Sequence, residues 1–262
     1  MTELEKGKNY TARMMQAERN VKSRIDDILS DAAVKIATQA RSLRFSSNES
    51  LYRQAVAVLA KDVLEKAMDS ISEYVREYSK ASISILGDKD TGATTRLLNS
   101  ELFGKTFDER NRKYVNYFAD DIANILIMCD RLKLKGNKIT EAILAAYKSP
   151  YESDLMSKSQ KAKKGPVSVP SHGRGIYHSA YQNIVRNAQG VISIAWSKER
   201  KNKAKRDGSI GFFVHRGSSY PCDICDAEVE AGLHEMDEEA PPYHVNCCCV
   251  VEYVYRKEED DE

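Results

Sequence analysis

Residues 222–225 read Cys-Asp-Ile-Cys, and residues 244–249 read His-Val-Asn-Cys-Cys-Cys. These two segments place five of the six cysteines of the 262-residue chain, together with one histidine, within 28 residues. Packing alone does not require cysteines at fixed offsets, but a metal ion does. Zn²⁺ takes four tetrahedral sulfur or nitrogen ligands, usually as two tight pairs separated by a longer loop. The pattern predicts a structural zinc ion in the C-terminal part of the chain.

The ligand candidates form two pairs, the first from the Cys-x-x-Cys segment and the second from the histidine with one later cysteine. In an extended strand Cys247 and Cys249 share one face and Cys248 points away, so Cys248 is the poorest candidate. The spacing leaves Cys247 and Cys249 open as the fourth ligand. The predicted metal ligands are Cys222, Cys225, His244, Cys247 and Cys249.

Two other states of these thiols compete with a metal site. Disulfides are possible in principle, but no signal peptide opens the sequence, and a cytoplasmic product keeps its cysteines reduced. Unligated thiols on a strand are the second alternative. The magnitudes favour a metal, because structural zinc contributes about 10–16 kcal/mol in small peptides, against about 3–4 kcal/mol for a disulfide that closes such a loop.

A catalytic zinc is a weaker interpretation. Residues 221–225 match the Pro-Cys-x-x-Cys half of the zinc deaminases, but that chemistry also needs His-x-Glu upstream. The upstream histidines, His172, His178 and His215, have no glutamate at that offset. The sequence also contains no His-Glu-x-x-His or Gly-x-Ser-x-Gly motif and no phosphate-binding glycine loop. We therefore expect a protein that is not an enzyme and has no small-molecule substrate.

Charge is distributed unevenly along a chain whose formal net charge is only +1. Residues 151–220 hold 13 Lys/Arg against 4 Asp/Glu, whereas residues 221–262 hold 2 against 14. The basic stretch is either a surface for nucleic-acid phosphates or an acidic partner, or simply a solvated helix end. The acidic residues 258–262 are expected to be disordered. The predicted nucleic-acid or partner-binding residues are Lys198, Arg200, Lys201, Lys203, Lys205 and Arg206.

Apolar spacing in the first 149 residues, which contain no proline, is helical. It predicts helices over about 10–43, 52–87 and 141–147, and another that begins near Thr106 or Asp108. No run of 18 apolar residues occurs, so we expect no membrane partner. The sequence does not decide whether the helices bury their apolar faces together or present one to a partner.

The remainder of the chain changes character twice. Residues 151–175 combine lysines with glycine and proline and are expected to form a mobile connector. A helix is expected over about 176–203, followed by alternating strands around 210–214 and 249–255 that flank the cysteine loop. The predicted fold class is α+β, with a helical region (1–150), a basic Gly/Pro linker (151–175) and a small helix-plus-β-hairpin domain with the Cys/His motif and an acidic tail (176–262).

The order of features in residues 173–255 resembles the C-terminal domain of the phage Mu F-like minor head proteins, the phage head-morphogenesis family. The resemblance lies in Asn-Ile-Val-Arg-Asn-Ala at 183–188, Gly-Phe-Phe-Val-His at 211–215, Cys-x-x-Cys, the later Gly232, and Pro-x-His-x-x-Cys-x-Cys at 242–249. Members usually carry Arg where Cys248 stands and Thr-Glu near residues 189–190, so no role is carried over to those positions.

The resemblance implies a minor head protein of a tailed phage or prophage that acts in procapsid assembly near the portal. The implied partners are the portal and other capsid proteins, with phage DNA as a further contact. The implied location is the virion, in the head interior or portal region, and the host cytoplasm during assembly. The alternative is a zinc-stabilised DNA-binding module or a zinc-dependent nucleic-acid enzyme that shares only the ligand spacing.

Overall fold

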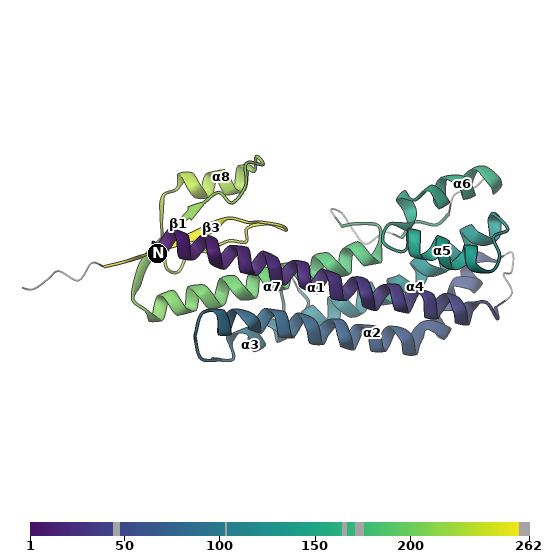
Figure 1. Cartoon of the computed structure of the whole chain (residues 1–262), viewed down its shortest axis with the longest axis horizontal. Helices are drawn as coiled ribbons and strands as arrows, with labels where there is room; N and C mark the ends of the chain where they lie inside the picture. Colours follow the sequence, from purple (N-terminus) through teal and green to yellow (C-terminus); the bar gives the residue numbers. More distant parts are fainter. Residues whose placement is uncertain (44–47, 103, 164–166, 171–175, 257–262) are drawn as a thin grey trace, which may run out of the picture. The chain divides into compact units, whose positions relative to one another are not determined.

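The computed structural model describes residues 1–43, 48–102, 104–163, 167–170 and 176–256. The predicted acidic tail and parts of the predicted linker, 164–166 and 171–175, lie outside these residues. The described residues form helices and one small antiparallel sheet, so the α+β fold class is confirmed (Figure 1). The elements are α1 (Glu3–Ala40), α2 (Glu49–Ile85), α3 (Ala93–Asn99), α4 (Phe107–Arg131), α5 (Asn137–Ala146), a 3₁₀ helix η1 (Pro150–Glu152), α6 (Asp154–Lys163), α7 (Ala180–Arg206), β1 (Ser209–His215), α8 (Asp223–Glu230), β2 (Leu233–Glu235) and β3 (Val250–Tyr255).

The long helices follow the apolar spacing closely. The predicted start near Thr106 is confirmed, because Thr106 caps α4 through a reciprocal pair of hydrogen bonds. The backbone N–H of Glu109 donates to the Thr106 hydroxyl over 3.2 Å, and the backbone N–H of Thr106 donates to the Glu109 carboxylate over 2.8 Å. This capping box satisfies two N–H groups that would otherwise lack partners. No helix in the described ranges is long and apolar enough to cross a bilayer.

The chain divides into two compact units that are not consecutive in sequence. Unit 1 contains residues 1–21, 75–104 and 188–262, and unit 2 contains residues 22–74 and 105–187. The predicted boundaries at residues 150 and 175 do not coincide with this division. The reason is that α1, α2 and α7 each contribute one end to unit 1 and the other end to unit 2.

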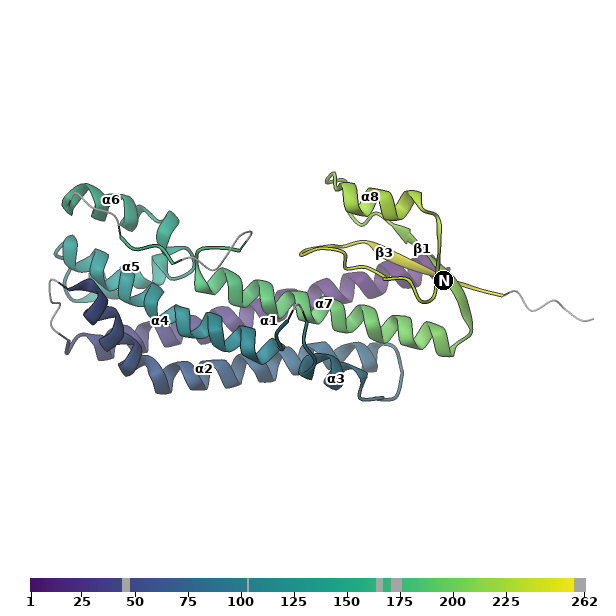
Figure 2. The same ribbon diagram turned by 180° about the vertical axis from the view of Figure 1, so that it is seen from behind.

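The predicted linker is also partly wrong, since residues 154–163 form α6 in unit 2. Lysines there were interpreted as a sign of mobility, but lysine and glutamine are good helix formers. Met156 and Ser159 are buried, and α6 packs against α4. Helices α5 and α6 lie beside α4 in both views of the ribbon (Figures 1 and 2). Burial of Met156 against α4 thus holds in place a segment whose sequence is mostly hydrophilic.

A buried carboxyl of unit 2 receives two hydrogen bonds at the start of α7. Asp121 of α4 is fully buried and accepts from the Tyr151 hydroxyl over 2.6 Å and from the backbone N–H of Ala180 over 2.7 Å. Burial raises the pKa of Asp121 to about 7, although these two hydrogen bonds lower it. The carboxyl therefore holds its proton to much higher pH than it does in an unfolded chain.

This shift predicts a pH dependence of stability. Below pH ~4 the Asp121 carboxyl is protonated in both the folded and the unfolded chain. Between pH ~4 and ~7 only the unfolded chain releases the proton. The free energy of unfolding should therefore fall as pH rises through this window. Urea unfolding from pH 4 to 8 should show this fall in the parent and a flatter profile in Asp121→Asn. Parallel profiles in the two proteins would contradict the assignment.

The helical part of unit 1 is built around the single tryptophan. Trp196 of α7 is 1% exposed, and its indole N–H donates to the Tyr78 carbonyl of α2 over 2.8 Å. Tyr10 of α1 donates its hydroxyl to the Trp196 carbonyl over 2.8 Å, and the two rings lie 5.2 Å apart. On the same helix, Glu199 accepts from the backbone N–H of Thr94 at the start of α3. These contacts join α1, α2, α3 and α7 within unit 1.

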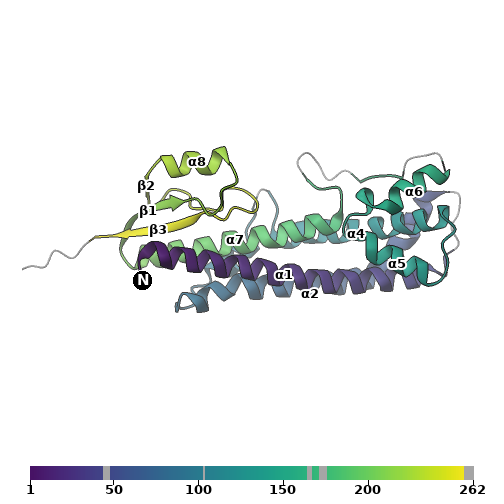
Figure 3. The same ribbon diagram turned by 45° about the horizontal axis from the view of Figure 1, so that its top comes forward.

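The sheet of unit 1 has the strand order β2-β1-β3, with β1 antiparallel to both neighbours (Figure 3). The predicted alternation holds for Phe212 and Val214, which are buried. Ile210 is 47% exposed instead, because the pairing of β1 with β3 shifts register between Ser209 and Gly211. A register shift of one residue turns a side chain to the other face of a sheet.

Candidate metal centre

The Cys-x-x-Cys segment begins a helix that the sequence analysis did not predict. Cys222 is the N-cap residue of α8, and Cys225 lies in its first turn. The backbone N–H of Asp226 donates to the Cys222 carbonyl over 2.9 Å, which closes that turn. One helical turn therefore places both thiols at the N-terminal end of α8, where backbone N–H groups favour a negative charge.

The second ligand segment turns sharply between β2 and β3. The backbone N–H of Cys247 donates to the His244 carbonyl over 3.2 Å, and Asn246 between them has a φ of 62°. Asparagine tolerates this left-handed conformation better than most residues. The turn returns the chain so that His244 and Cys247 both reach the start of α8.

The side chains of both segments converge. The Nε2 atom of His244 lies 3.3 Å from the Cys222 sulfur and 3.1 Å from the Cys225 sulfur, and the Cys225 and Cys247 sulfurs are 3.9 Å apart. The ligand atoms of two overlapping triads each lie within 4.8 Å of one another, and Cys225 belongs to both. The triads are Cys222, Cys225 and His244, and Cys225, Cys247 and Cys249. This Cys/His cluster contains all five predicted ligands and can hold a metal ion.

The geometry leaves the choice between Cys247 and Cys249 open, because both are in the second triad. Cys248 lies in neither triad, as predicted for the poorest candidate. His244 is oriented for ligation through Nε2, since its Nδ1 lies 2.8 Å from the Val245 carbonyl and donates to it. A backbone carbonyl that fixes the ring tautomer in this way is typical of histidine ligands.

Electrostatics within the cluster favour thiolate at some positions and thiol at others. The backbone N–H of Cys225 lowers the pKa of Cys222, and the hydrogen bond from the Cys249 thiol lowers the pKa of Cys247 to about 5. Burial raises the pKa of Cys225 to about 12. The carbonyl of Val245 raises the pKa of His244. Because metal ligands bind deprotonated, the lowered pKa values of Cys222 and Cys247 favour the form of these thiols that binds a metal.

The cluster is part of the hydrophobic core of the sheet. Cys225, Cys247 and Cys249 are 2%, 6% and 7% exposed. They belong to one buried group with side chains of β1, β3 and α7, whose other members are Ala204, Phe212, Val214, Met236, Val251 and Tyr253. A bound ion would therefore join the Cys/His loop to the sheet from within the core.

Two residues outside the predicted ligand set support the loop. Arg216, just after β1, forms an ion pair with Asp226 of α8 and donates to the backbone carbonyls of Tyr220 and, over 3.3 Å, Cys222. Asp226 also accepts from the backbone N–H of Cys222 over 3.3 Å. The sequence analysis missed this pair, although an arginine and an aspartate that bracket a Cys-x-x-Cys segment are a visible signal.

Replacement of Arg216 tests this support. Arg216→Gln should leave all five candidate ligands in place but loosen residues 216–226, and outer-shell partners are typically worth 10–100-fold in metal affinity. We expect metal affinity to fall by about that factor in a competition titration with a chelator. Arg256→Gln, which removes an exposed arginine after β3, is the matched control. Equal affinities in the two variants would contradict a supporting role for Arg216.

The predicted basic surface is smaller in the structure than in the sequence. Arg200 is only 9% exposed, so its assignment to an exposed patch was wrong. Lys203 and Arg206 form ion pairs with Asp207 and Asp88, and Lys201 donates to the Glu238 carbonyl. Lys198 and Lys205 are exposed and form no ion pair with a described residue.

No protein-family model, curated protein or solved structure matches the chain.

Proposed function

We propose that the Cys/His cluster binds one structural zinc ion per chain. Sulfurs bound to one tetrahedral zinc at about 2.3 Å lie about 3.8 Å apart, and a sulfur and an imidazole nitrogen lie about 3.6 Å apart. The Cys225–Cys247 distance of 3.9 Å and the His244–cysteine distances of 3.1 and 3.3 Å are similar to these ligand–ligand distances. The donor set of thiolates and one imidazole is also that of structural zinc sites.

Burial supports a structural rather than a catalytic ion. Catalytic zinc keeps one position open to water or substrate, whereas structural zinc is closed by four protein ligands. Here three cysteines of the cluster are buried in the core beneath the sheet, and a fourth cysteine and the histidine complete the donors. The ion would fix the loop between β1 and β3. Most of this loop has no regular secondary structure of its own.

On this basis we propose that the protein has a structural role, as a minor head protein in procapsid assembly near the portal of a tailed phage or prophage. The observation that carries the proposal is the convergence of the Cys-x-x-Cys and Pro-x-His-x-x-Cys-x-Cys segments on one centre, in the order found in the Mu F-like family. The proposed partners are the portal and other capsid proteins. The proposed location is the virion, with the host cytoplasm during assembly.

The second candidate function is a zinc-stabilised DNA-binding module. The exposed Lys198 and Lys205 of α7 favour it, because unpaired surface cations are available to phosphates. Against it, four of the six predicted contacts are buried or already engaged within the chain. Two free lysines support only weak, strongly salt-dependent binding.

Two measurements test the proposed function. Metal analysis of protein purified under reducing conditions should find one zinc per chain, and a metal-free result would remove the zinc proposal. Coexpression with the portal, scaffold and major capsid proteins of the phage or prophage that encodes it should place the chain in procapsids. Procapsids that assemble normally without it and never contain it would contradict the assembly role.

A third measurement distinguishes the DNA-binding module from the structural role. The binding of duplex DNA should be measured at two salt concentrations in the parent and in the Lys198→Gln/Lys205→Gln variant. Specific loss of tight DNA binding in the variant, with zinc retained, would favour the DNA-binding module. If the parent does not bind DNA, the DNA-binding module is excluded and a protein partner remains the proposal.

A further inference from the structure

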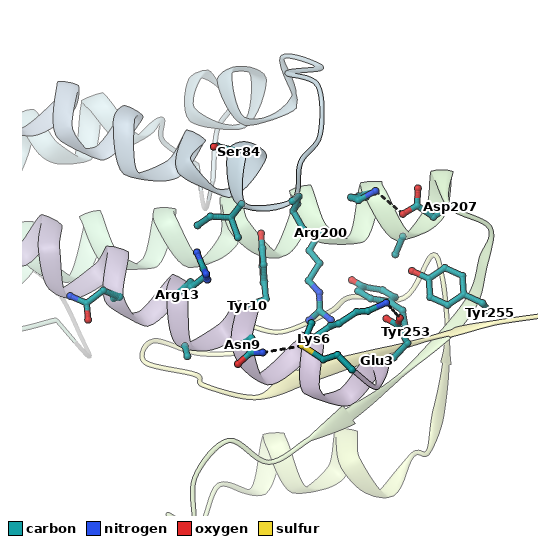
Figure 4. Close-up of a pocket in the computed structure, with 17 residues that line it drawn as sticks. Glu3, Lys6, Asn9, Tyr10, Arg13, Ser84, Arg200, Asp207, Tyr253 and Tyr255 are labelled. Carbon is teal, nitrogen blue, oxygen red and sulfur yellow. Dashed lines mark hydrogen bonds and ion pairs between the residues drawn. The ribbon is translucent and has the colours of Figure 1, made fainter.

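Arg200 of α7 is a buried cation held between aromatic rings of unit 1. Its guanidinium carbon lies 5.3 Å from the ring centre of Tyr10 on α1 and 5.1 Å from that of Tyr253 on β3 (Figure 4). Gly7 lets α1 approach closely here, since a Cβ at that position would lie 3.2 Å from an Arg200 nitrogen and 2.4 Å from the Val251 carbonyl oxygen. The side chain is therefore fixed by packing on more than one side.

Packing fixes Arg200 without satisfying its hydrogen bonds. The residue is nine-tenths buried, yet within the described part of the chain it donates no hydrogen bond and forms no ion pair. Aromatic rings attract the positive charge but do not replace oxygen acceptors for its five N–H donors. Buried arginines are normally paired, because an uncompensated buried charge is strongly unfavourable. The N–H donors of Arg200 are therefore available to an oxygen acceptor that the described residues do not provide.

The guanidinium lines a cleft that can admit such a group. The cleft has a volume of about 1040 Å³ and is lined by side chains of α1, α7 and β3, together with the end of α2 (Figure 4). Its two carboxylates are already engaged, Glu3 with Lys6 over 2.6 Å and Asp207 with Lys203 over 2.8 Å. Arg13, which is exposed and forms no ion pair with a described residue, adds a second available cation.

We propose that this cleft binds an oxyanion group of a ligand, a phosphate or a carboxylate, with Arg200 as its principal donor and Arg13 as a second cation. A planar guanidinium matches two oxygens of either group through parallel N–H···O bonds. Tyr10 and Tyr253 orient the guanidinium, so little side-chain freedom is lost on binding. None of the five candidate metal ligands lines the cleft.

The test uses inorganic phosphate and acetate as probes, with ionic strength held constant by sodium chloride. Trp196 is the only tryptophan, and its ring lies 5.2 Å from that of Tyr10, so its fluorescence is a built-in reporter. Titration of the full chain should give a saturable change with at least one probe, accompanied by a higher melting temperature. Stronger binding of phosphate would identify the ligand group as phosphate, and stronger binding of acetate as carboxylate.

Two variants with one cation removed give the decisive comparison. Arg200→Met should weaken binding by at least about tenfold, whereas Lys8→Met, which removes an exposed cation of α1 outside the cleft, should leave it unchanged. If Arg200→Met does not fold, as judged by circular dichroism and zinc content, Arg13→Met provides the same test from the surface. No saturable binding in the parent, or equal binding in parent, Arg200→Met and Arg13→Met, would overturn the proposal.

Discussion

Cys225→Ser is expected to remove the metal ion and unfold the loop between β1 and β3. Cys225 is the only ligand candidate shared by the two triads, so its loss breaks both. A serine hydroxyl is a poor replacement for a thiolate on zinc, and structural zinc supplies about 10–16 kcal/mol in small domains. Zinc content should fall from one per chain to near zero after dialysis, and hydrogen exchange should accelerate in residues 216–249.

Cys248→Ser is the matched control for this prediction. It makes the same chemical change in the same cluster of cysteines, but at a residue that lies in neither triad. It should retain zinc and the parental exchange pattern. The same measurement on Cys247→Ser and Cys249→Ser assigns the fourth ligand to whichever variant loses the ion. Full zinc content in Cys225→Ser would refute the metal centre as described.

Gly217→Ala should be the second most damaging change, although it touches no ligand. A Cβ at Gly217 would lie 1.7 Å from the carbonyl oxygen of Cys248 and 2.5 Å from its carbonyl carbon. Backbone cannot move aside as a flexible side chain can, so the segment that carries Cys247 and Cys249 must shift. We expect a loss of about 3 kcal/mol in the free energy of unfolding, the upper end of overpacking effects, together with weaker zinc binding.

Gly190→Ala is the control for this second prediction. Gly190 lies within α7, and a Cβ there would meet no atom within 4 Å. Alanine is the better helix former, so this variant should gain about 0.5–1 kcal/mol. Urea denaturation of both variants measures the difference. Equal stabilities of Gly217→Ala and Gly190→Ala would show that the approach of Gly217 to Cys248 is not close in solution.

The sequence was most informative where structure depends on local periodicity. Helices α1, α2 and α4 follow from apolar spacing and the start of α4 from the Thr106 cap, although α1 begins at Glu3, ahead of the predicted start near residue 10. The cysteine cluster could also be predicted, because ligand spacing directly reflects metal geometry. Zinc itself, the head-protein function and its partners stay predictions.

Elements that depend on distant contacts could not be predicted in this way. Strand β2 has three residues and exists through its pairing with β1. Helix α8 was not predicted, because Pro221 and Asp223 beside the Cys-x-x-Cys segment are residues typical of turns. The burial of Arg200 had a usable signal, since it stands four residues from both Trp196 and Ala204 on the buried stripe of α7. The lysines and arginines around it led to its assignment to a basic surface instead.

The discontinuous make-up of the two units limits how the protein can be shortened. A fragment that stops at residue 150 keeps Tyr10 but discards Trp196, whose carbonyl is the acceptor of the tyrosine hydroxyl. A fragment that starts at residue 176 keeps the cysteines but lacks Gly7 and the helix that carries it against β3. Neither truncation yields a self-sufficient module, and mixing the two pieces should restore the contacts of Tyr10 with Trp196 and of Gly7 with β3, but not those of Tyr151 and α6.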